Sequence, residues 1–237
     1  MWWTIPVYGA GAYRWPVIGA IFAALAVFAY FCGCFNGAVI VSKYILRDDV
    51  RGHGSGNAGL TNFHRVFGGK LTALVLLLDV VKMVVAMVVA ALVVGGWLSA
   101  LGVARSEAAG QAWIVFGKYW AGLWCLLGHM FPCTFGFKGG KGILSGVTLL
   151  FCVDWRMGAI ALGLFIIVVA LTRYISLGSI LATASSPVSA FFLVSREPVI
   201  IALSVAVALL VIWMHRGNVV RLAKGTENKF SLHRKEK

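Results

Sequence analysis

Charged residues are scarce in this 237-residue sequence: Asp, Glu, Lys and Arg together make up only 12% of it. Soluble domains carry about 25% charged residues, so this chain lacks the polar side chains to cover the surface of a soluble globule. Because 60% of its residues are apolar, it does not have the composition of a disordered or fibrous chain either. Alternating patterns of strand length are absent, and the apolar runs are too long for barrel strands. The composition therefore predicts an all-α integral membrane protein.

Acidic residues are especially few: the sequence has eight Asp and Glu but 21 Lys and Arg, which gives a net charge of +13. In a soluble protein such an excess would suggest nucleic acid as a partner. In a membrane protein it indicates topology and affinity for lipid headgroups or phosphate-bearing substrates. The five cysteines show no spacing of paired metal ligands, and their odd number argues against a disulfide framework. We therefore expect no metal, no cofactor and no nucleic-acid partner.

Windows with few charges divide the chain into seven predicted transmembrane helices. A helix needs about 20 residues to cross the hydrocarbon core, so the short fourth window must tilt, pack among neighbouring helices or use its flanking residues. The second window contains Asp79 and Lys82, one helical turn apart, and we expect these ions to pair and to support the site structurally. The seven windows cover residues 15–42, 71–104, 119–137, 142–153, 157–172, 174–195 and 198–214.

Most Lys and Arg residues fall in the loops on one side of these windows. Because basic loops stay in the cytoplasm, this asymmetry predicts an outer N-terminus and a cytoplasmic C-terminus. Residues 1–14, with Trp2, Trp3 and Tyr8, would form an outer interfacial segment. The remaining parts would be a seven-helix membrane domain at 15–214, with cytoplasmic motif loops at 47–70 and 128–142, and a basic cytoplasmic tail at 215–237.

Three polar segments on the predicted cytoplasmic side are rich in glycine. In the first, residues 51–65, the glycines allow the backbone to turn with φ > 0 and to present successive N–H groups, which suits an anion. Arg51 and Arg65 bracket this segment, and its polar residues add side-chain donors. The candidate binding residues are Gly54, Ser55, Gly56, Asn57, Thr61 and Asn62.

The second segment, residues 128–142, places lysines and paired glycines directly before a predicted helix start. Helix N-termini attract phosphate through free N–H groups and the helix dipole. A nucleotide-binding P-loop does not match, because Phe135 stands where its first glycine should be and Gly142 replaces the magnesium-binding hydroxyl. The segment therefore predicts a phosphate site without a metal, with candidate residues His129, Lys138, Gly139, Gly140, Lys141 and Gly142.

The third segment follows the last window and begins with His215, which shares a helix face with Asn218 at i, i+3. Arg221 and Lys224 suit a basic anchor beside the membrane, which leaves His215 and Asn218 unexplained and makes them candidates for the site. A Ser-His-Asp triad is poorly supported, because the carboxylates on this side lie at no partner spacing; they are Asp48, Asp49, Glu227 and Glu236.

Four motifs in this order resemble the PlsY family, the acyl-phosphate-dependent glycerol-3-phosphate acyltransferases of bacterial membranes. They are GSGN-x-G-x-TN-x-x-R, GH-x-FP-x5-KGGKG, R-x-x-SLGS and HR-x-N-x-x-RL-x-x-GTE, and the resemblance runs from about Gly33 to Phe230. The sequence departs from the family at residues 35–38, where Phe-Asn-Gly-Ala replaces Gly-Ser-Ile-Pro. We therefore do not expect the first helix to break there.

The resemblance implies transfer of a fatty acyl group from acyl phosphate to the 1-hydroxyl of glycerol 3-phosphate, giving lysophosphatidic acid. It places this metal-free reaction at the bacterial cytoplasmic (inner) membrane, with the site facing the cytoplasm and membrane lipid as the other partner. The sequence leaves the oligomeric state open, and a monomer is compatible with it. Either His215 or the substrate's own phosphate would take the proton, and the scarcity of carboxylates favours the phosphate, with His215 orienting and donating. The resemblance also adds Ser179 to the substrate-binding residues and implies catalytic roles for Ser55, Arg65, Lys141, His215 and Asn218.

Two other functions fit part of the pattern. A membrane transporter for an anionic phosphate-bearing solute would also gather cations, but it should show helices broken at the midplane or internal repeats. A protein that tethers nucleic acid would use the basic tail, whose one aromatic residue is Phe230 and which therefore offers no stacking platform. Because no His–Asp pair with HxxxxD spacing lies on the cytoplasmic side, acyl-CoA is not the expected donor.

Overall fold

The computed structural model of the protein describes residues 15–102 and 106–230, and every regular element within these ranges is helical. The all-α prediction is therefore confirmed for the part of the chain that the structure describes. The predicted outer segment, residues 1–14 with Trp2, Trp3 and Tyr8, lies outside the described residues, as does the end of the predicted tail.

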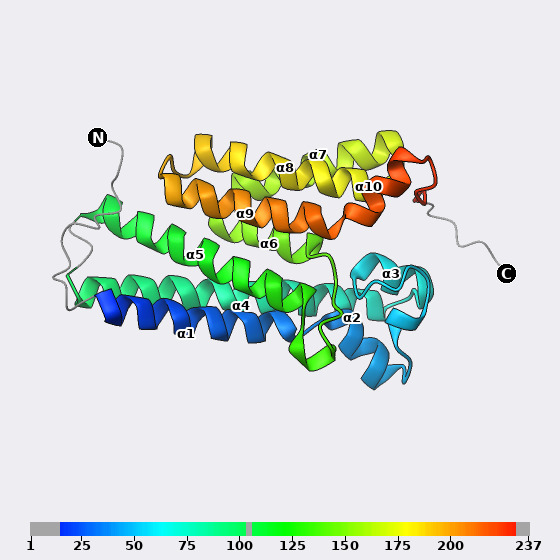
Figure 1. Cartoon of the computed structure of the whole chain (residues 1–237), viewed down its shortest axis with the longest axis horizontal. Helices are drawn as coiled ribbons and strands as arrows, with labels where there is room; N and C mark the ends of the chain where they lie inside the picture. The colour runs from blue at the N-terminus through cyan, green and yellow to red at the C-terminus, as the bar shows by residue number, and fades with distance from the viewer. Residues whose placement is uncertain (1–14, 103–105, 231–237) are drawn as a thin grey trace.

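The longer helices run along the long axis of the molecule in two groups, with one short helix between them (Figure 1). One group is α1, α4 and α5, and the other is α7, α8 and α9. The short helix α6 contacts helices of both groups. The bounds are α1 Trp15–Cys34, α4 Leu71–Ala100, α5 Glu107–Met130, α6 Ile143–Val153, α7 Trp155–Thr172, α8 Ile175–Leu193 and α9 Pro198–Met214.

Helix α6 corresponds to the short fourth window. Its 11 residues make it about 16 Å long, so its helical residues alone are too short to cross a hydrocarbon core of about 30 Å and a span here needs its flanking residues. It contacts α4, α5, α7, α8 and α9, so it packs among its neighbours, which is one of the three arrangements that the sequence allowed.

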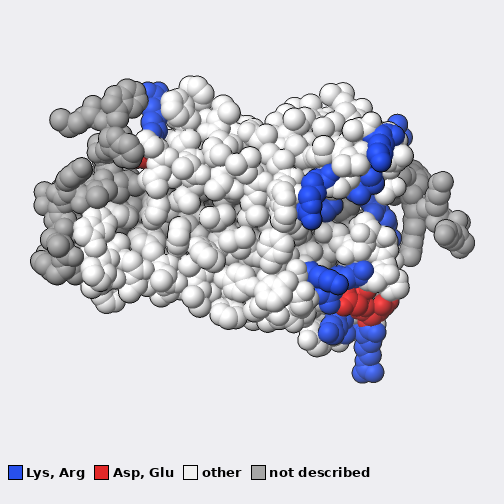
Figure 2. Space-filling model, viewed as in Figure 1, with Lys and Arg blue, Asp and Glu red and all other residues white. Residues whose placement is uncertain are grey.

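Short elements gather at one end of the bundle, which we call the basic end. Figure 2 shows that most of the Lys and Arg side chains visible in this view lie there, while the middle of the molecule is almost free of charge. The short elements are α2 Gly37–Ile40, the π-helical turn η2 Val41–Ile45, the 3-10 turns η3 Val50–Gly52 and η4 Cys133–Phe135, and the helices α3 Leu60–Val66 and α10 Arg216–Ala223.

Four helices are long and apolar enough to cross a membrane: α1, residues Leu71–Trp97 of α4, α7 and α8. Helices α9 and α10 pass the same test together, although they are bent by 58° relative to each other. This gives four or five candidate spans among the described residues. The number of seven spans and the orientation of the termini stay predictions.

The first helix breaks where we expected none. Helix α1 ends at Cys34, and α2 begins at Gly37 after Phe35 and Asn36. The Asn36 side chain makes the break possible, because its Oδ1 accepts from the N–H of Val39 (3.1 Å) and caps α2. Its Nδ2 also donates to the carbonyl of Ala58 (3.0 Å), which ties the break to the first glycine-rich segment. The prediction of one continuous helix over 15–42 is therefore wrong.

The third helix also differs from its window, since it runs over Glu107–Met130 rather than 119–137. The charge of Lys118 does not end it, because the Lys118 Nζ donates to the carbonyl of Cys152 at the end of α6 (2.7 Å). Helix α5 ends before Pro132, which restricts the residue before it to non-helical conformations.

Candidate active site

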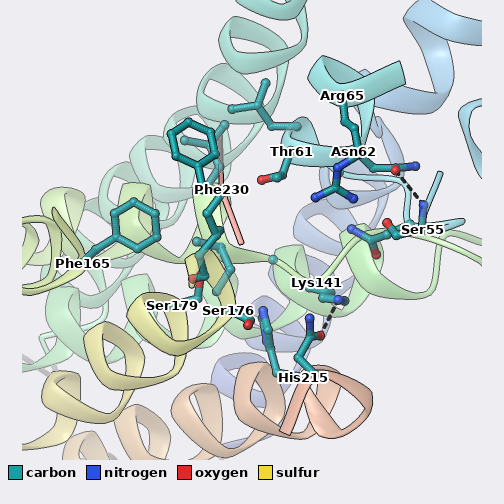
Figure 3. Close-up of a pocket in the computed structure, with 18 of the residues that line it drawn as sticks. Ser55, Thr61, Asn62, Arg65, Lys141, Phe165, Ser176, Ser179, His215 and Phe230 are labelled. Carbon is teal, nitrogen blue, oxygen red and sulfur yellow. Dashed lines mark hydrogen bonds between the residues drawn. The ribbon is translucent and has the colours of Figure 1, made fainter. Parts of the chain in front are cut away.

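One cavity of about 300 Å³ lies at the basic end, and its wall brings together all three glycine-rich segments (Figure 3). Its polar lining comes from the first segment, α4, α5, residues 141–142, α8, His215 and α10 with the chain that follows. Its apolar lining comes from α3, α6, α7, α8 and Phe230. The lining residues are Ser55, Asn57, Gly59, Leu60, Thr61, Asn62, Arg65, Asp79, His129, Lys141, Gly142, Ile143, Leu144, Val147, Leu162, Phe165, Ile175, Ser176, Ser179, His215, Asn218, Arg221, Glu227, Asn228 and Phe230.

Asn62 holds the first segment in shape. Its Oδ1 accepts from the N–H of Ser55 (2.9 Å), and its Nδ2 donates to the carbonyls of Val50 (3.2 Å) and His53 (3.1 Å). These bonds use both donors of the amide, so Asn62 shapes the loop and offers no free side-chain donor to a ligand. The hydroxyl of Ser55 has no partner among the described residues and lies at the cavity wall.

The glycines of the first segment serve its turns. Gly54 and Gly56 have φ of 58° and 69°, and a Cβ at Gly54 would overlap the Oδ1 of Asn62. Neither glycine lines the cavity, and the N–H of Gly56 donates to the carbonyl of His53 (2.9 Å). The structure therefore brings Ser55, Asn57, Thr61 and Arg65 to the cavity but leaves Gly54 and Gly56 behind its wall.

The two arginines that bracket this segment have different environments. Arg51 pairs with the carboxylate of Asp49 (2.7 Å) and donates to the carbonyls of Phe135 (2.6 Å) and Lys138 (3.2 Å), so it joins the first segment to the second. Its hydrogen bond holds the pKa of Asp49 below the usual value. Arg65 has no hydrogen-bond or ion-pair partner among the described residues, and Figure 3 shows its guanidinium pointing into the cavity.

The second segment presents fewer donors than we predicted. The N–H of Gly139 donates to the carbonyl of Met130 and the N–H of Gly140 to that of His129, both at 3.1 Å. These two N–H groups are therefore not free for phosphate, and neither glycine lines the cavity. The side chain of Lys138 is exposed and also lies off the cavity wall. Of the predicted residues in this segment, the structure brings His129, Lys141 and Gly142 to the cavity.

Lys141 is the cation of this loop that meets the third segment. Its Nζ donates to the Oδ1 of Asn218 at 2.6 Å (Figure 3). Burial and the nearby Arg221 lower the pKa of Lys141 from its usual value. Because its side-chain partner is a neutral amide, its charge is not compensated by a direct ion pair.

The third segment is part of the cavity rather than a plain tail. The chain bends at His215, between α9 and α10, and α10 carries Asn218 and Arg221 to the cavity wall. Helix α10, the first part of the predicted basic tail, therefore belongs to the cavity wall. The chain then returns toward the start of α8, where the N–H of Phe230 donates to the carbonyl of Arg173 (2.7 Å).

Glu227 connects these elements, although we did not predict it as a site residue. Its Oε1 accepts from Asn218 (2.7 Å) and Ser176 (2.9 Å), and its Oε2 accepts from Arg221 (2.7 Å). Burial alone would raise the pKa of Glu227, but these three hydrogen bonds hold it below the usual value. The signal was present in the sequence, because Glu227 ends the fourth motif and Ser176 lies in the third.

His215 has a defined tautomer. Its Nδ1 lies 2.8 Å from the carbonyl oxygen of Val211, which can only accept, so the ring donates from Nδ1. Burial lowers the pKa of His215 from its usual value, which favours the neutral ring. A neutral ring that donates from Nδ1 offers a lone pair at Nε2, so our expectation that His215 donates to substrate does not fit this geometry.

Ser179 and His129 line the cavity with their polar groups partly used. The hydroxyl of Ser179 donates to the carbonyl of Ile175 within α8 (2.8 Å). The Nδ1 of His129 accepts from Lys82 (2.7 Å), and Lys82 pairs with Asp79 (2.6 Å), as the spacing of these two ions predicted.

Within the described ranges, no three His, Cys, Asp or Glu side chains gather in a way that could hold a metal ion.

Comparisons with known proteins agree with the sequence motifs. The sequence model of the family described as "Glycerol-3-phosphate acyltransferase" matches residues 23–225. The glycerol-3-phosphate acyltransferase of Thermoanaerobacter pseudethanolicus is 38% identical over 205 residues, which cover 86% of this chain and 93% of the relative. That of Fusobacterium nucleatum is 34% identical over 209 residues, which cover 88% of this chain and 98% of the relative.

The fold agrees as well. The crystal structure of PlsY, an integral membrane glycerol 3-phosphate acyltransferase, in its glycerol 3-phosphate form superposes with a TM-score of 0.74 at 29% identity. The match covers 89% of this chain and 96% of that chain. The lysophosphatidic acid form of PlsY gives a TM-score of 0.72. Sequence and fold together show that this chain belongs to the PlsY family of integral membrane glycerol-3-phosphate acyltransferases.

Proposed function

We propose that this protein transfers a fatty acyl group from acyl phosphate to the 1-hydroxyl of glycerol 3-phosphate and releases lysophosphatidic acid and phosphate. The observation that carries the proposal is the two-sided cavity, with Arg65 and Lys141 on one side and Phe165 and Phe230 on the other (Figure 3). The reaction needs cations for two phosphates and an apolar surface for the acyl chain, side by side.

The charges of the cavity suit a phosphate monoester, which carries about −1.5 to −2 charges near neutral pH. Arg221 is paired with Glu227, whereas Arg65 has no carboxylate partner among the described residues and Lys141 contacts a neutral amide. Two cations are therefore available to a ligand. The free hydroxyl of Ser55 and the hydroxyl of Thr61, which points into the cavity in Figure 3, add donors for phosphate oxygens.

The reacting hydroxyl would bind to His215. The Nε2 lone pair of the neutral ring accepts a hydrogen bond from the 1-hydroxyl and so orients its oxygen toward the acyl carbonyl carbon. The carbon–oxygen bond to glycerol forms, the carbon–oxygen bond to the departing phosphate breaks, and the hydroxyl proton passes by way of Nε2 of His215 to the phosphate of glycerol 3-phosphate. The mechanism is therefore substrate-assisted, and Lys141, held by Asn218, stabilises the charge that grows on the departing phosphate. Acyl phosphate is a mixed anhydride and is already activated, so the step requires neither coenzyme A nor a metal.

We also propose that α1 and α4–α9 form seven spans, with the basic end in the cytoplasm of a bacterial inner membrane. The basic residues and the cavity lie at the same end, which agrees with the rule that positive loops face the cytoplasm. The cavity is built from one chain, so a monomer suffices. Both helix breaks, at Asn36 and His215, lie at the basic end, which gives the transporter alternative no support from helices broken at the midplane.

The test uses the purified full chain in lipid nanodiscs with acyl phosphate and glycerol 3-phosphate. We expect lysophosphatidic acid and phosphate in equal amounts, and neither product when one substrate is left out. Glycerol without phosphate should be a poor acceptor, because it gives Arg65 and Lys141 no anion. A folded protein that makes no lysophosphatidic acid but moves glycerol 3-phosphate across vesicles would overturn the proposal in favour of a transporter.

A further inference from the structure

A buried ion cluster lies against the cavity, between α4 and α5. The Nζ of Lys82 contacts the Oδ1 of Asp79 (2.6 Å), the Nδ1 of His129 (2.7 Å) and the carbonyl oxygen of Phe35 (3.1 Å). The exposed fractions of Asp79, His129 and Lys82 are only 1%, 3% and 6%. An ammonium has three N–H donors, and each of them has one acceptor here. The cluster therefore fixes the Lys82 side chain completely.

This arrangement decides the tautomer of His129. The ammonium group of Lys82 carries donors only, so Nδ1 of His129 must offer its lone pair and the ring proton lies on Nε2. Asp79 keeps the ammonium in place, because its Oδ1 accepts from Lys82 and also from the N–H of Gly37 (3.3 Å). The Oδ1 of Asp79 lies 3.8 Å from the His129 Nδ1, beyond hydrogen-bond distance.

The Nε2–H group of His129 is left over from this cluster. It has no hydrogen-bond partner among the described residues. It also differs from the indole nitrogens of Trp113 and Trp124, which have no partner and are completely enclosed by protein atoms. His129 is one of the residues that line the cavity. A Cβ at Gly140 would overlap this same nitrogen, so the glycine keeps the space in front of it clear.

The neighbouring loop explains why this donor is needed. The N–H groups of Gly139 and Gly140 are used by the carbonyls of Met130 and His129, so they cannot bind a ligand oxygen. The Nε2–H of His129 lies beside Gly140, directly before Lys141 in the chain. It therefore supplies a fixed, neutral donor at the place where the loop's own donors are occupied.

We propose that His129 donates a hydrogen bond from Nε2 to an oxygen of the bound acyl-phosphate group, and that Lys82 and Asp79 act as positioning residues that hold His129 in this tautomer. The inference rests on the proposed function, because it takes acyl phosphate as the ligand beside Lys141. A fixed donor aimed at an oxygen that gains charge during acyl transfer contributes more to the transition state than to the bound substrate.

The test compares two substitutions of His129 that remove different hydrogen-bonding groups of the ring. Asn at this position keeps an acceptor near Nδ1 for Lys82 but has no donor at Nε2, whereas Gln places an amide N–H near Nε2. We expect His129→Asn to lower kcat/KM for acyl phosphate about 10²-fold, with KM for glycerol 3-phosphate changed less than about threefold. His129→Gln should recover part of the activity. Tyr30→Phe is the matched control, because it removes a hydrogen bond to the same loop, at Phe131, without facing the cavity.

Nitrogen NMR of the histidine-labelled wild-type protein tests the tautomer directly and does not depend on activity. We expect one ring signal, absent in His129→Asn, with protonated Nε2 and unprotonated Nδ1. A protonated Nδ1, or wild-type kinetics in a folded His129→Asn protein, would overturn the inference. If the wild-type protein made no lysophosphatidic acid, the proposed function itself would fail, while the NMR result would still report the tautomer.

Discussion

Replacing Lys141 by Met tests the assignment of the phosphate site most sharply. Methionine keeps the length and the apolar stem of the side chain but removes the charge. In the structure this change deletes the 2.6 Å hydrogen bond from Nζ to the Oδ1 of Asn218. It also removes one of the two cations of the cavity wall that have no carboxylate partner among the described residues. Asn218 keeps its second anchor, because its Nδ2 still donates to Glu227. The fold should therefore survive, at a cost of about 1–3 kcal/mol for the amide oxygen left without a donor.

The loss of activity should be much larger than the loss of stability. A cation about 4 Å from a phosphate charge contributes about 4 kcal/mol at the effective dielectric constant of about 20 that suits protein sites. Deleting one fixed electrostatic contact in an active site typically lowers kcat by about 10²–10³, which corresponds to about 2.7–4 kcal/mol. The two estimates agree, so we expect kcat of Lys141→Met to fall by about 10²–10³.

The assay is lysophosphatidic acid formation by purified protein at saturating acyl phosphate, with thermal unfolding measured on the same samples. Lys224→Met is the matched control, since Lys224 is exposed, lies off the cavity wall and makes no side-chain contact among the described residues. It should keep wild-type activity. A folded Lys141→Met protein with most of its activity would refute the assignment of Lys141 to the phosphate.

Five further predictions concern the site, the acyl donor and the topology. Lys138→Met should lower activity far less than Lys141→Met, because the Lys138 side chain lies off the cavity wall; an equal loss measured in the same assay would contradict this. Glu227→Gln should lower the midpoint of thermal unfolding, because Arg221 loses its anion, and an unchanged midpoint would disagree. Burial lowers the pKa of Lys141, so kcat/KM should fall as the pH rises through a value below 10.5, and a flat alkaline profile would speak against its charge. Acyl-CoA as sole donor should give no product, and a C-terminal reporter should be active in the cytoplasm; turnover with acyl-CoA or a periplasmic reporter signal would refute these two expectations.

The fold class was readable from the sequence because a membrane helix depends on local composition. Long apolar windows with few charges predict helices regardless of what packs against them, and the helices appear in the predicted order. The ends of the helices were less predictable. Lys118 looked like a boundary, but its charge is satisfied by a carbonyl of α6, and Asn36 caps a new helix where the family's usual motif is missing. Both outcomes depend on partners that are distant in the sequence.

The cavity shows a similar contrast: the sequence predicted which residues line it, but not which of their polar groups are free to bind a ligand. The motifs pointed to Ser55, Arg65, Lys141, His215 and Asn218, and the structure brings all five to one wall. A motif does not show which donors are already used. The amide of Asn62 and the N–H groups of Gly139 and Gly140 were predicted to meet a ligand, but backbone carbonyls occupy them.

The sequence by itself determined that this chain is helical, suits a membrane and carries phosphate-binding chemistry, because these properties follow from composition and from motifs read along the chain. Only the tertiary structure decided how the charges are compensated. Glu227 neutralises Arg221 but not Arg65, and Lys82 fixes the tautomer of His129 across two helices. Hydrogen bonds and ion pairs are short-ranged and directional, so the state of each polar group depends on which distant residue the fold places within about 3 Å of it.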